Sequence, residues 1–99
     1  MEAAEVSGRQ AFRIWVSGRV QGVGFRWAAR QTARDLGGLV GRVRNLPDGR
    51  VEVEVAGEPE HIEALRGWLR RGPTGARVTG LTEQEITPVP DWDGFVIDR

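Results

Sequence analysis

A glycine-rich segment with two arginines, residues 18–26, could bind a small anion. It reads Gly-Arg-Val-Gln-Gly-Val-Gly-Phe-Arg. Glycines let main-chain N–H groups converge on one point, because no Cβ blocks the approach. The apolar pattern that starts at Phe25 predicts a helix, whose free N–H groups and positive dipole end favour an anion. Arg26 then lies in the first helical turn, where its planar guanidinium can hold a phosphate with two hydrogen bonds. Taken alone, a segment of this kind is more often a structural turn.

The same segment differs from the common nucleotide-binding loops. It does not end in Gly-Lys-Ser or Gly-Lys-Thr, so it is not a Walker loop. Gly22-Val23-Gly24 lacks the third glycine of the dinucleotide fingerprint, and the helix that follows does not lead into a parallel βαβ unit. These two nucleotide-binding loops are therefore excluded, and a site for a small anion remains open.

A second segment, residues 41–49, reads Gly-Arg-Val-Arg-Asn-Leu-Pro-Asp-Gly. Asn45 stands at the end of a predicted strand, just before a turn. An amide can both accept a hydrogen bond from a water and donate one to it without taking its proton, which suits a residue that orients an attacking water. The alternative is a turn residue whose amide binds its own main chain.

Together the two segments resemble the signatures of the acylphosphatase family. Residues 18–26 match the commonest form of the first signature throughout. Residues 41–49 match the second, Gly-aromatic-Val-x-Asn-x-x-Asp-Gly, except at Arg42. The resemblance extends from Phe12 to Ile97. It implies hydrolysis of acyl phosphates to a carboxylate and inorganic phosphate.

The resemblance also implies roles for individual residues. Arg26 would bind the phosphate, and Asn45 would orient the attacking water. The main chain of six consecutive residues would cradle the phosphate: Gln21, Gly22, Val23, Gly24, Phe25 and Arg26. Arg42 stands where the family usually has Trp or Tyr. Because it alternates with Asn45 along a strand, we expect it on the opposite face, away from the chemistry.

The elements that must position these residues follow from the apolar pattern. Alternation predicts strands over 11–17, 39–45, 50–56 and 76–86, with a short last strand at 95–97; helical periodicity predicts helices over 25–36 and 58–71. This order predicts an α+β, ferredoxin-like sandwich, with two helices on one face of an antiparallel sheet of four to five strands. If the turn centres on Asp48, Arg44 faces Glu52 and Arg42 faces Glu54.

Composition limits the other possibilities. The chain has 99 residues, enough for one domain, which we place at 11–99 after a flexible tail at 1–10. It has no cysteine, and its 14 basic residues balance 14 acidic ones. No apolar run reaches the roughly 20 residues of a membrane helix, and residues 1–10 do not resemble a secretory signal. We therefore expect a cytoplasmic monomer that binds neither membranes nor nucleic acid.

No ligand cluster for a metal is apparent, so we expect no metal and no cofactor. His61, the only histidine, is predicted on the surface of a helix. The four tryptophans are predicted to serve packing or to lie on the surface: Trp15, Trp27, Trp68 and Trp92. Inorganic phosphate is expected as product and inhibitor.

Two alternative functions remain. One is a ferredoxin-like module that binds a phosphoryl ligand or RNA without turnover, and the other is a domain directed at carbamoyl phosphate, of the kind found in larger maturation proteins. The length of the chain, sufficient for this domain alone, favours the free enzyme over the latter.

Overall fold

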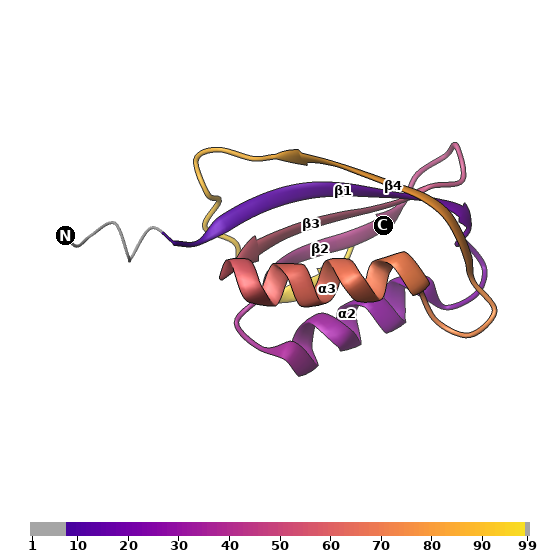
Figure 1. Cartoon of the computed structure of the whole chain (residues 1–99), viewed down its shortest axis with the longest axis horizontal. Helices are drawn as coiled ribbons and strands as arrows, with labels where there is room; N and C mark the ends of the chain where they lie inside the picture. The colour runs from indigo at the N-terminus through magenta and orange to yellow at the C-terminus, as the bar shows by residue number, and fades with distance from the viewer. Residues whose placement is uncertain (1–7, 99) are drawn as a thin grey trace.

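The computed structural model describes residues 8–98 of the chain. Seven elements follow one another in the order β-α-β-β-α-β-β (Figure 1). They are β1 (Gln10–Arg19), α2 (Phe25–Leu36), β2 (Val40–Asn45), β3 (Val51–Gly57), α3 (Pro59–Arg71), β4 (Arg77–Glu85) and β5 (Phe95–Ile97). Most of the tail expected at residues 1–10 lies outside the described residues. The last residue of that expected tail, Gln10, is the first residue of β1.

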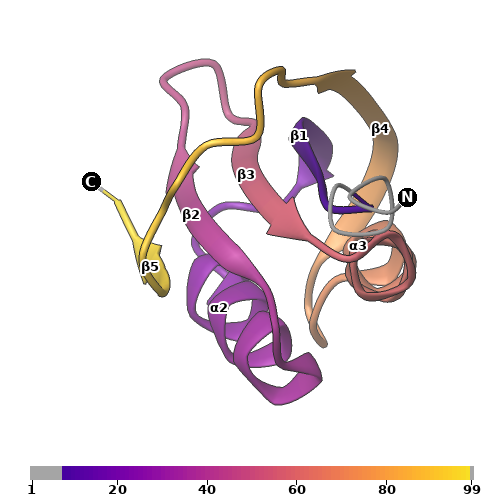
Figure 2. The ribbon, with the colours of Figure 1, turned by 90° about the vertical axis from the view of Figure 1, so that its left-hand side faces the viewer.

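The five strands form one sheet in the order β4-β1-β3-β2-β5, and both helices pack on the same face of it (Figures 1 and 2). Every neighbouring pair among β4, β1, β3 and β2 is antiparallel. The predicted ferredoxin-like sandwich is therefore confirmed. The connection from β1 through α2 to β2 places the start of α2 next to the end of β2, because β1 and β2 run in the same direction.

One detail of the predicted sheet is wrong. β5 pairs with β2 in parallel, with Gly41 opposite Phe95 and Val43 opposite Ile97, so the sheet is mixed and not purely antiparallel. The path of the chain explains this direction. β4 ends at the end of the sheet where β2 begins, and the segment 86–94 crosses that end to the opposite edge (Figure 2). A strand that starts at that end of the sheet and pairs with β2 must run in the same direction as β2.

The core lies between the sheet and the two helices. It is built from the apolar residues that alternate along the strands and from one stripe of each helix. Ile14, Val43 and Val53 from the sheet and Ala29 and Leu65 from the helices are each 0% exposed. The tight packing fixes the angle and register of α2 on the sheet, which in turn fixes where the first turn of α2 points.

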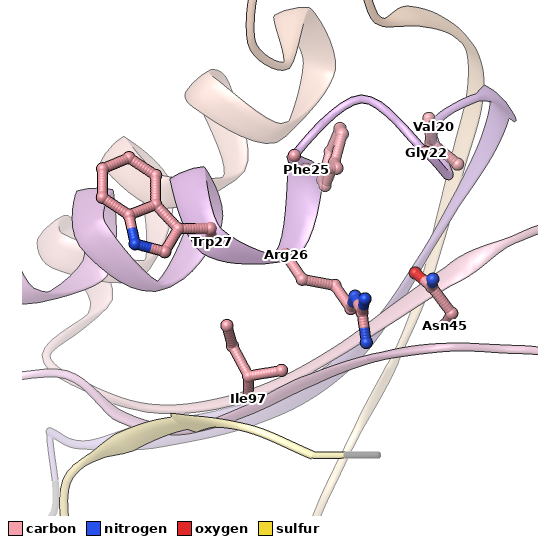
Figure 3. Close-up of a pocket in the computed structure, with 8 residues that line it drawn as sticks. Val20, Gly22, Phe25, Arg26, Trp27, Asn45 and Ile97 are labelled. Carbon is pink, nitrogen blue, oxygen red and sulfur yellow. The ribbon is translucent and has the colours of Figure 1, made fainter.

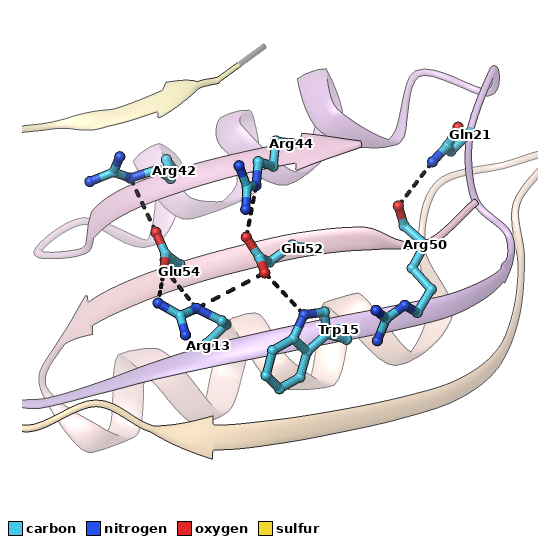
Figure 4. A network of polar contacts seen from close by, with 8 residues as sticks. All are labelled: Arg13, Trp15, Gln21, Arg42, Arg44, Arg50, Glu52 and Glu54. Atoms are coloured by element: carbon cyan, nitrogen blue, oxygen red, sulfur yellow. Dashed lines mark hydrogen bonds and ion pairs between the residues drawn. The ribbon is translucent and has the colours of Figure 1, made fainter. Parts of the chain in front are cut away.

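The opposite face of the sheet carries a polar network (Figure 4). As predicted, Arg44 lies opposite Glu52 and Arg42 lies opposite Glu54 across the hairpin. Glu52 is only 7% exposed and accepts hydrogen bonds from Arg44 Nε at 2.8 Å and from Trp15 Nε1 at 3.0 Å. These bonds join β1, β3 and β2 on the face that no helix covers.

Candidate active site

A cavity of about 200 Å³ lies where the start of α2, the end of β2 and β5 meet (Figure 3). Eight of the residues that the structure describes line it: Val20, Gly22, Gly24, Phe25, Arg26, Trp27, Asn45 and Ile97. The two segments that the sequence singled out thus contribute to one cavity, although Arg26 and Asn45 are far apart in the sequence.

The glycine-rich turn forms one wall of the cavity. Gly22 and Gly24 adopt left-handed conformations, with φ of +77° and +76°. A Cβ at either position would meet no atom within 4 Å, so the backbone conformation and not the space demands glycine there. Gly24 is also the N-cap of α2 and has no side chain to cap it. The first N–H groups of α2 therefore remain available to an anion in the cavity.

Arg26 supplies the positive charge of the cavity. Its side chain extends from the first turn of α2 toward the end of β2 (Figure 3). Among residues 8–98 it makes no ion pair, whereas Arg13, Arg42 and Arg44 are each paired with Glu52 or Glu54. A guanidinium without a carboxylate partner is ready to bind an anion with its full charge.

Asn45 is the last residue of β2 and lies opposite Val51 of β3. It shares the helix-facing side of the sheet with Val43, because residues two apart along a strand face the same way. Its side-chain amide points into the cavity from the side opposite the glycine-rich turn and makes no hydrogen bond with the described part of the chain (Figure 3). The amide is therefore available to a water or a ligand, and the turn that follows Asn45 does not use it.

Gln21 and Val23 are not among the lining residues, although both belong to the expected cradle. The side chain of Gln21 turns toward the β2–β3 turn, where Nε2 donates to the carbonyl oxygen of Leu46 at 2.8 Å and to that of Arg50 at 2.9 Å. Figure 4 draws the second of these bonds. Val23 packs against the core. For these two residues, only the main chain is left to contact a phosphate.

Three lining residues, Val20, Trp27 and Ile97, were not predicted from the sequence. Val20 is 1% exposed and belongs to the hydrophobic core. Trp27 follows Arg26 directly, but adjacent residues of a helix do not face each other, so its place beside the same cavity had no signal in the sequence. Ile97 reaches the cavity only because β5 pairs with β2, which the sequence pattern did not predict.

Three other residues with a predicted position, Arg42, Trp68 and His61, lie outside the cavity lining. Arg42 lies on the outer face of the sheet, away from the cavity as predicted. Its Nε is 3.3 Å from Glu54 Oε1, and its Cζ lies 5.2 Å from the centroid of the Trp92 ring. Trp68 packs against Phe25, with ring centroids 5.4 Å apart. His61 lies in the first turn of α3 as expected, but it is half-buried, and not on the open surface, because it packs against Gly38.

The turn that carries Asn45 is held by local hydrogen bonds. The main-chain N–H of Arg50 donates to Asp48 Oδ1 at 3.1 Å, and Arg50 Nε donates to Asp48 Oδ2 at 2.9 Å. The hydrogen bond from the Arg50 main chain is the main cause that lowers the pKa of Asp48 below its ordinary value, since it favours the ionised carboxylate. Asp48 thus serves the turn, as the sequence suggested.

Two further features bear on the class of site. Within residues 8–98, no three His, Cys, Asp or Glu side chains come together as they would around a metal ion. Neither helix in this part of the chain has the length and apolar character needed to cross a membrane.

Comparison with known proteins agrees with this geometry. The family model described as Acylphosphatase matches residues 12–97. An acylphosphatase of Pseudomonas paraeruginosa is 52% identical over 91 residues, which cover 92% of this chain and 98% of the relative. The structure of an acylphosphatase from Coxiella burnetii superposes with a TM-score of 0.88 at 38% identity, covering 99% of this chain and 100% of that one. The HypF protein of T. kodakarensis contains a similar domain, with a TM-score of 0.79 at 35% identity over 91% of this chain but 12% of HypF. With a glycine-rich turn, an arginine that makes no ion pair within residues 8–98 and a strand-end asparagine around one cavity, and with the two acylphosphatases above matching over almost their whole length, the chain belongs to the acylphosphatase family.

Proposed function

We propose that this chain hydrolyses acyl phosphates with Arg26 and the main chain of residues 21–26 holding the phosphoryl group and Asn45 orienting the attacking water. The observation that carries the proposal is the composition of the cavity. It offers an anion site and an amide, but none of the side chains from residues 8–98 that line it can act as a nucleophile or as a general acid at neutral pH. The reaction must therefore proceed without a protein nucleophile and without a protein general acid.

Hydrolysis of an acyl phosphate meets this condition. A water oxygen bonds to phosphorus while the bond from phosphorus to the acyl oxygen breaks, and the electron pair leaves with the carboxylate. A carboxylate is a stable leaving group and needs no proton. Both protons of the water end on the phosphate, so the products are a carboxylate and dihydrogen phosphate. The protein has only to neutralise phosphoryl charge and to align the water with the leaving group.

Arg26 and the N-terminus of α2 suit the first task. The guanidinium can hold two phosphoryl oxygens, and the N–H groups that follow Gly24 can hold the third. Asn45 suits the second task, because its carbonyl oxygen can accept from the water without removing the proton. A single oriented donor toward developing charge contributes about 3–4 kcal/mol to a transition state of this kind.

The proposal includes the setting of the reaction. The enzyme works in the cytoplasm as a monomer, without metal or cofactor, and binds neither membranes nor nucleic acid. The sequence without cysteine is compatible with a reducing compartment. RNA binding loses support on the outer face of the sheet, because Trp15 binds the carboxylate of Glu52 there and Glu54 adds a second negative charge.

The test is a comparison of leaving groups. We expect the purified protein to release phosphate from acetyl phosphate and benzoyl phosphate, with inorganic phosphate as a competitive inhibitor. We expect little turnover of p-nitrophenyl phosphate, a monoester, because the cavity has no acid to assist a poorer leaving group. Equal rates on the monoester would contradict the proposal, and binding of phosphate without any turnover would favour a non-catalytic binding module.

A further inference from the structure

Trp27 is an unusual surface residue. Its side chain is 57% exposed, and in the part of the chain that the structure describes only Val96, at 46%, is another large apolar residue with comparable exposure. The fold does not need the indole, because the buried residues of α2 are Phe25, Ala29 and Ala33. An exposed indole costs free energy of hydration, so a role outside the fold would explain its presence.

Trp27 lines the same cavity as Arg26 and Asn45, together with Ile97 of β5. Ile97 lies opposite Val43, and Asn45 is two residues further along β2 on the same face. Two residues of strand correspond to roughly 7 Å. Figure 3 shows the resulting order: Trp27 and Ile97 lie on one side of the Arg26 guanidinium, and Asn45 lies on the other.

This order matters because phosphoryl transfer is an in-line reaction. The attacking and leaving oxygens lie on opposite sides of the phosphorus atom. If Arg26 holds the phosphoryl group and Asn45 holds the water, the acyl group must leave from the side away from Asn45. That is the side where Trp27 and Ile97 lie (Figure 3).

We infer that Trp27 and Ile97 form a platform for the acyl group, and that the enzyme selects acyl phosphates whose acyl group is an uncharged aromatic or branched hydrocarbon. This inference rests on the proposed function and adds the substrate class to it. Trp27 offers the face of an indole, against which an aromatic ring can stack, and Ile97 offers a branched aliphatic surface. Acetyl phosphate is too small to contact much of either.

The charges around the cavity support an uncharged acyl group. Within residues 8–98, Arg26 is the only charged side chain that lines the cavity, and on the proposed function it is occupied by the phosphoryl group. An acyl group with a second carboxylate would lose hydration against Trp27 and Ile97 and find no cation there. An apolar acyl group instead removes exposed indole surface from water when it binds.

The test compares two substrates in two variants of Trp27. We expect Trp27→Ala to lower kcat/KM for benzoyl phosphate on the order of tenfold, mainly through KM, as expected for an apolar contact made in ground and transition states alike. The loss for acetyl phosphate should be about twofold or less. Trp27→Phe, which restores an aromatic face, should recover most of the preference for benzoyl phosphate.

The matched control is Val96→Ala. Val96 is exposed and adjacent to Ile97, but it lies opposite Arg42 on the outer face of the sheet. Its truncation should leave the ratio of the two substrates unchanged. An equal loss on both substrates in Trp27→Ala, or no loss on either, would overturn the platform while leaving the hydrolase reaction intact.

A binding measurement tests the platform without turnover. Benzoylphosphonate carries the phenyl group but cannot be hydrolysed at the same bond. It should stabilise the wild-type protein against thermal unfolding at lower concentration than inorganic phosphate does, and this advantage should vanish in Trp27→Ala. If the wild-type protein hydrolysed neither substrate, the proposed function would fail, and this measurement would still decide whether Trp27 binds the apolar group.

Discussion

The side-chain amide of Gln21 donates a hydrogen bond at 2.8 Å to the carbonyl oxygen of Leu46, the residue directly after Asn45. The second N–H of the same amide donates at 2.9 Å to the carbonyl oxygen of Arg50 on the other side of the turn. Leu46 and Arg50 also bond each other, from Leu46 N to Arg50 O at 2.8 Å. Gln21 therefore joins the glycine-rich turn to the strand end that carries the water-orienting amide.

We predict that Gln21→Ala lowers kcat by about 10- to 100-fold, because displacing a positioned group by about 1 Å is enough for such a loss. Phosphate affinity should change little, since the main-chain N–H groups of the turn remain. The free energy of unfolding should fall by about 1–2 kcal/mol, because two carbonyl oxygens each lose one partner. Steady-state kinetics and protection by phosphate against thermal unfolding separate these effects.

The control for Gln21 is Gln31→Ala. Gln31 carries the same amide on α2, but its hydrogen bond to Asp35 is exposed and neither residue lines the cavity. This variant should keep wild-type kcat. A Gln21→Ala enzyme with unchanged kcat would show that the turn holds Asn45 without help from Gln21.

Asn45→Ala should lower kcat by about 10²- to 10³-fold while phosphate still protects the protein against unfolding. The reason is that the Asn45 side chain makes no hydrogen bond within residues 8–98, so only its main chain supports the sheet, and its amide faces the cavity. Asn45→Asp should instead weaken phosphate binding, because a carboxylate would repel the anion. Loss of phosphate protection in Asn45→Ala would mean that Asn45 binds the anion itself.

Glu52→Ala should lower the free energy of unfolding by about 1–3 kcal/mol, because it removes a nearly buried, charged acceptor together with its hydrogen bonds. Glu52 is 7% exposed and binds both Trp15 Nε1 and Arg44 Nε. Chemical denaturation measures the change. Glu85→Ala removes an exposed carboxylate at the end of β4 and should change stability by no more than about 0.5 kcal/mol. Equal effects of the two substitutions would mean that the outer-face network contributes nothing.

The sequence predicted local features of the fold well. The Asp48-Gly49 turn and the alternating charges determined the register of the hairpin, and the structure has Arg44 opposite Glu52 as that register requires. Such features depend on residues close together in the chain. The direction of β5 could not be predicted in the same way, because a strand of three residues has no pattern of its own and its partner depends on the path of segment 86–94.

The same distinction applies to the candidate site. The glycine-rich turn and the place of Arg26 in the first turn of a helix follow from neighbouring residues, and the structure has both. The partners of Gln21 lie 25 and 29 residues away and are main-chain carbonyls, which leave no trace in the sequence. The presence of Ile97 and Trp27 at one cavity likewise depends on tertiary packing. The side of the cavity that would receive the acyl group was therefore absent from the prediction.

We predict that EDTA leaves the rate of acetyl phosphate hydrolysis unchanged. On the proposed mechanism Arg26 and main-chain N–H groups neutralise the phosphoryl oxygens, so a divalent cation has no task there. Within residues 8–98, Asp, Glu, His and Cys side chains form no cluster of three that could hold one. The assay compares chelated protein with protein supplied with Mg²⁺ or Zn²⁺. A loss in EDTA that either ion restores would contradict the mechanism.

Arg26→Ala should fail differently from Asn45→Ala. We expect phosphate affinity and turnover to fall together, because the guanidinium would contact the phosphoryl group in the ground state and in the transition state alike. Arg26→Lys should also be poor, since an ammonium group cannot reproduce two parallel hydrogen bonds from a planar fork. Kinetics on acetyl phosphate and thermal protection by inorganic phosphate measure the two quantities.

Arg34→Ala is the matched control for Arg26. Arg34 is an exposed arginine in the last turn of the same helix, at the end away from the cavity, so its removal changes the net charge equally without touching the site. It should retain both affinity and turnover, apart from a small electrostatic effect that salt screens. If Arg34→Ala and Arg26→Ala lost phosphate affinity equally, the anion would be responding to the overall charge of the protein. If Arg26→Ala alone kept full phosphate protection while Asn45→Ala lost it, the two proposed roles would have to be exchanged.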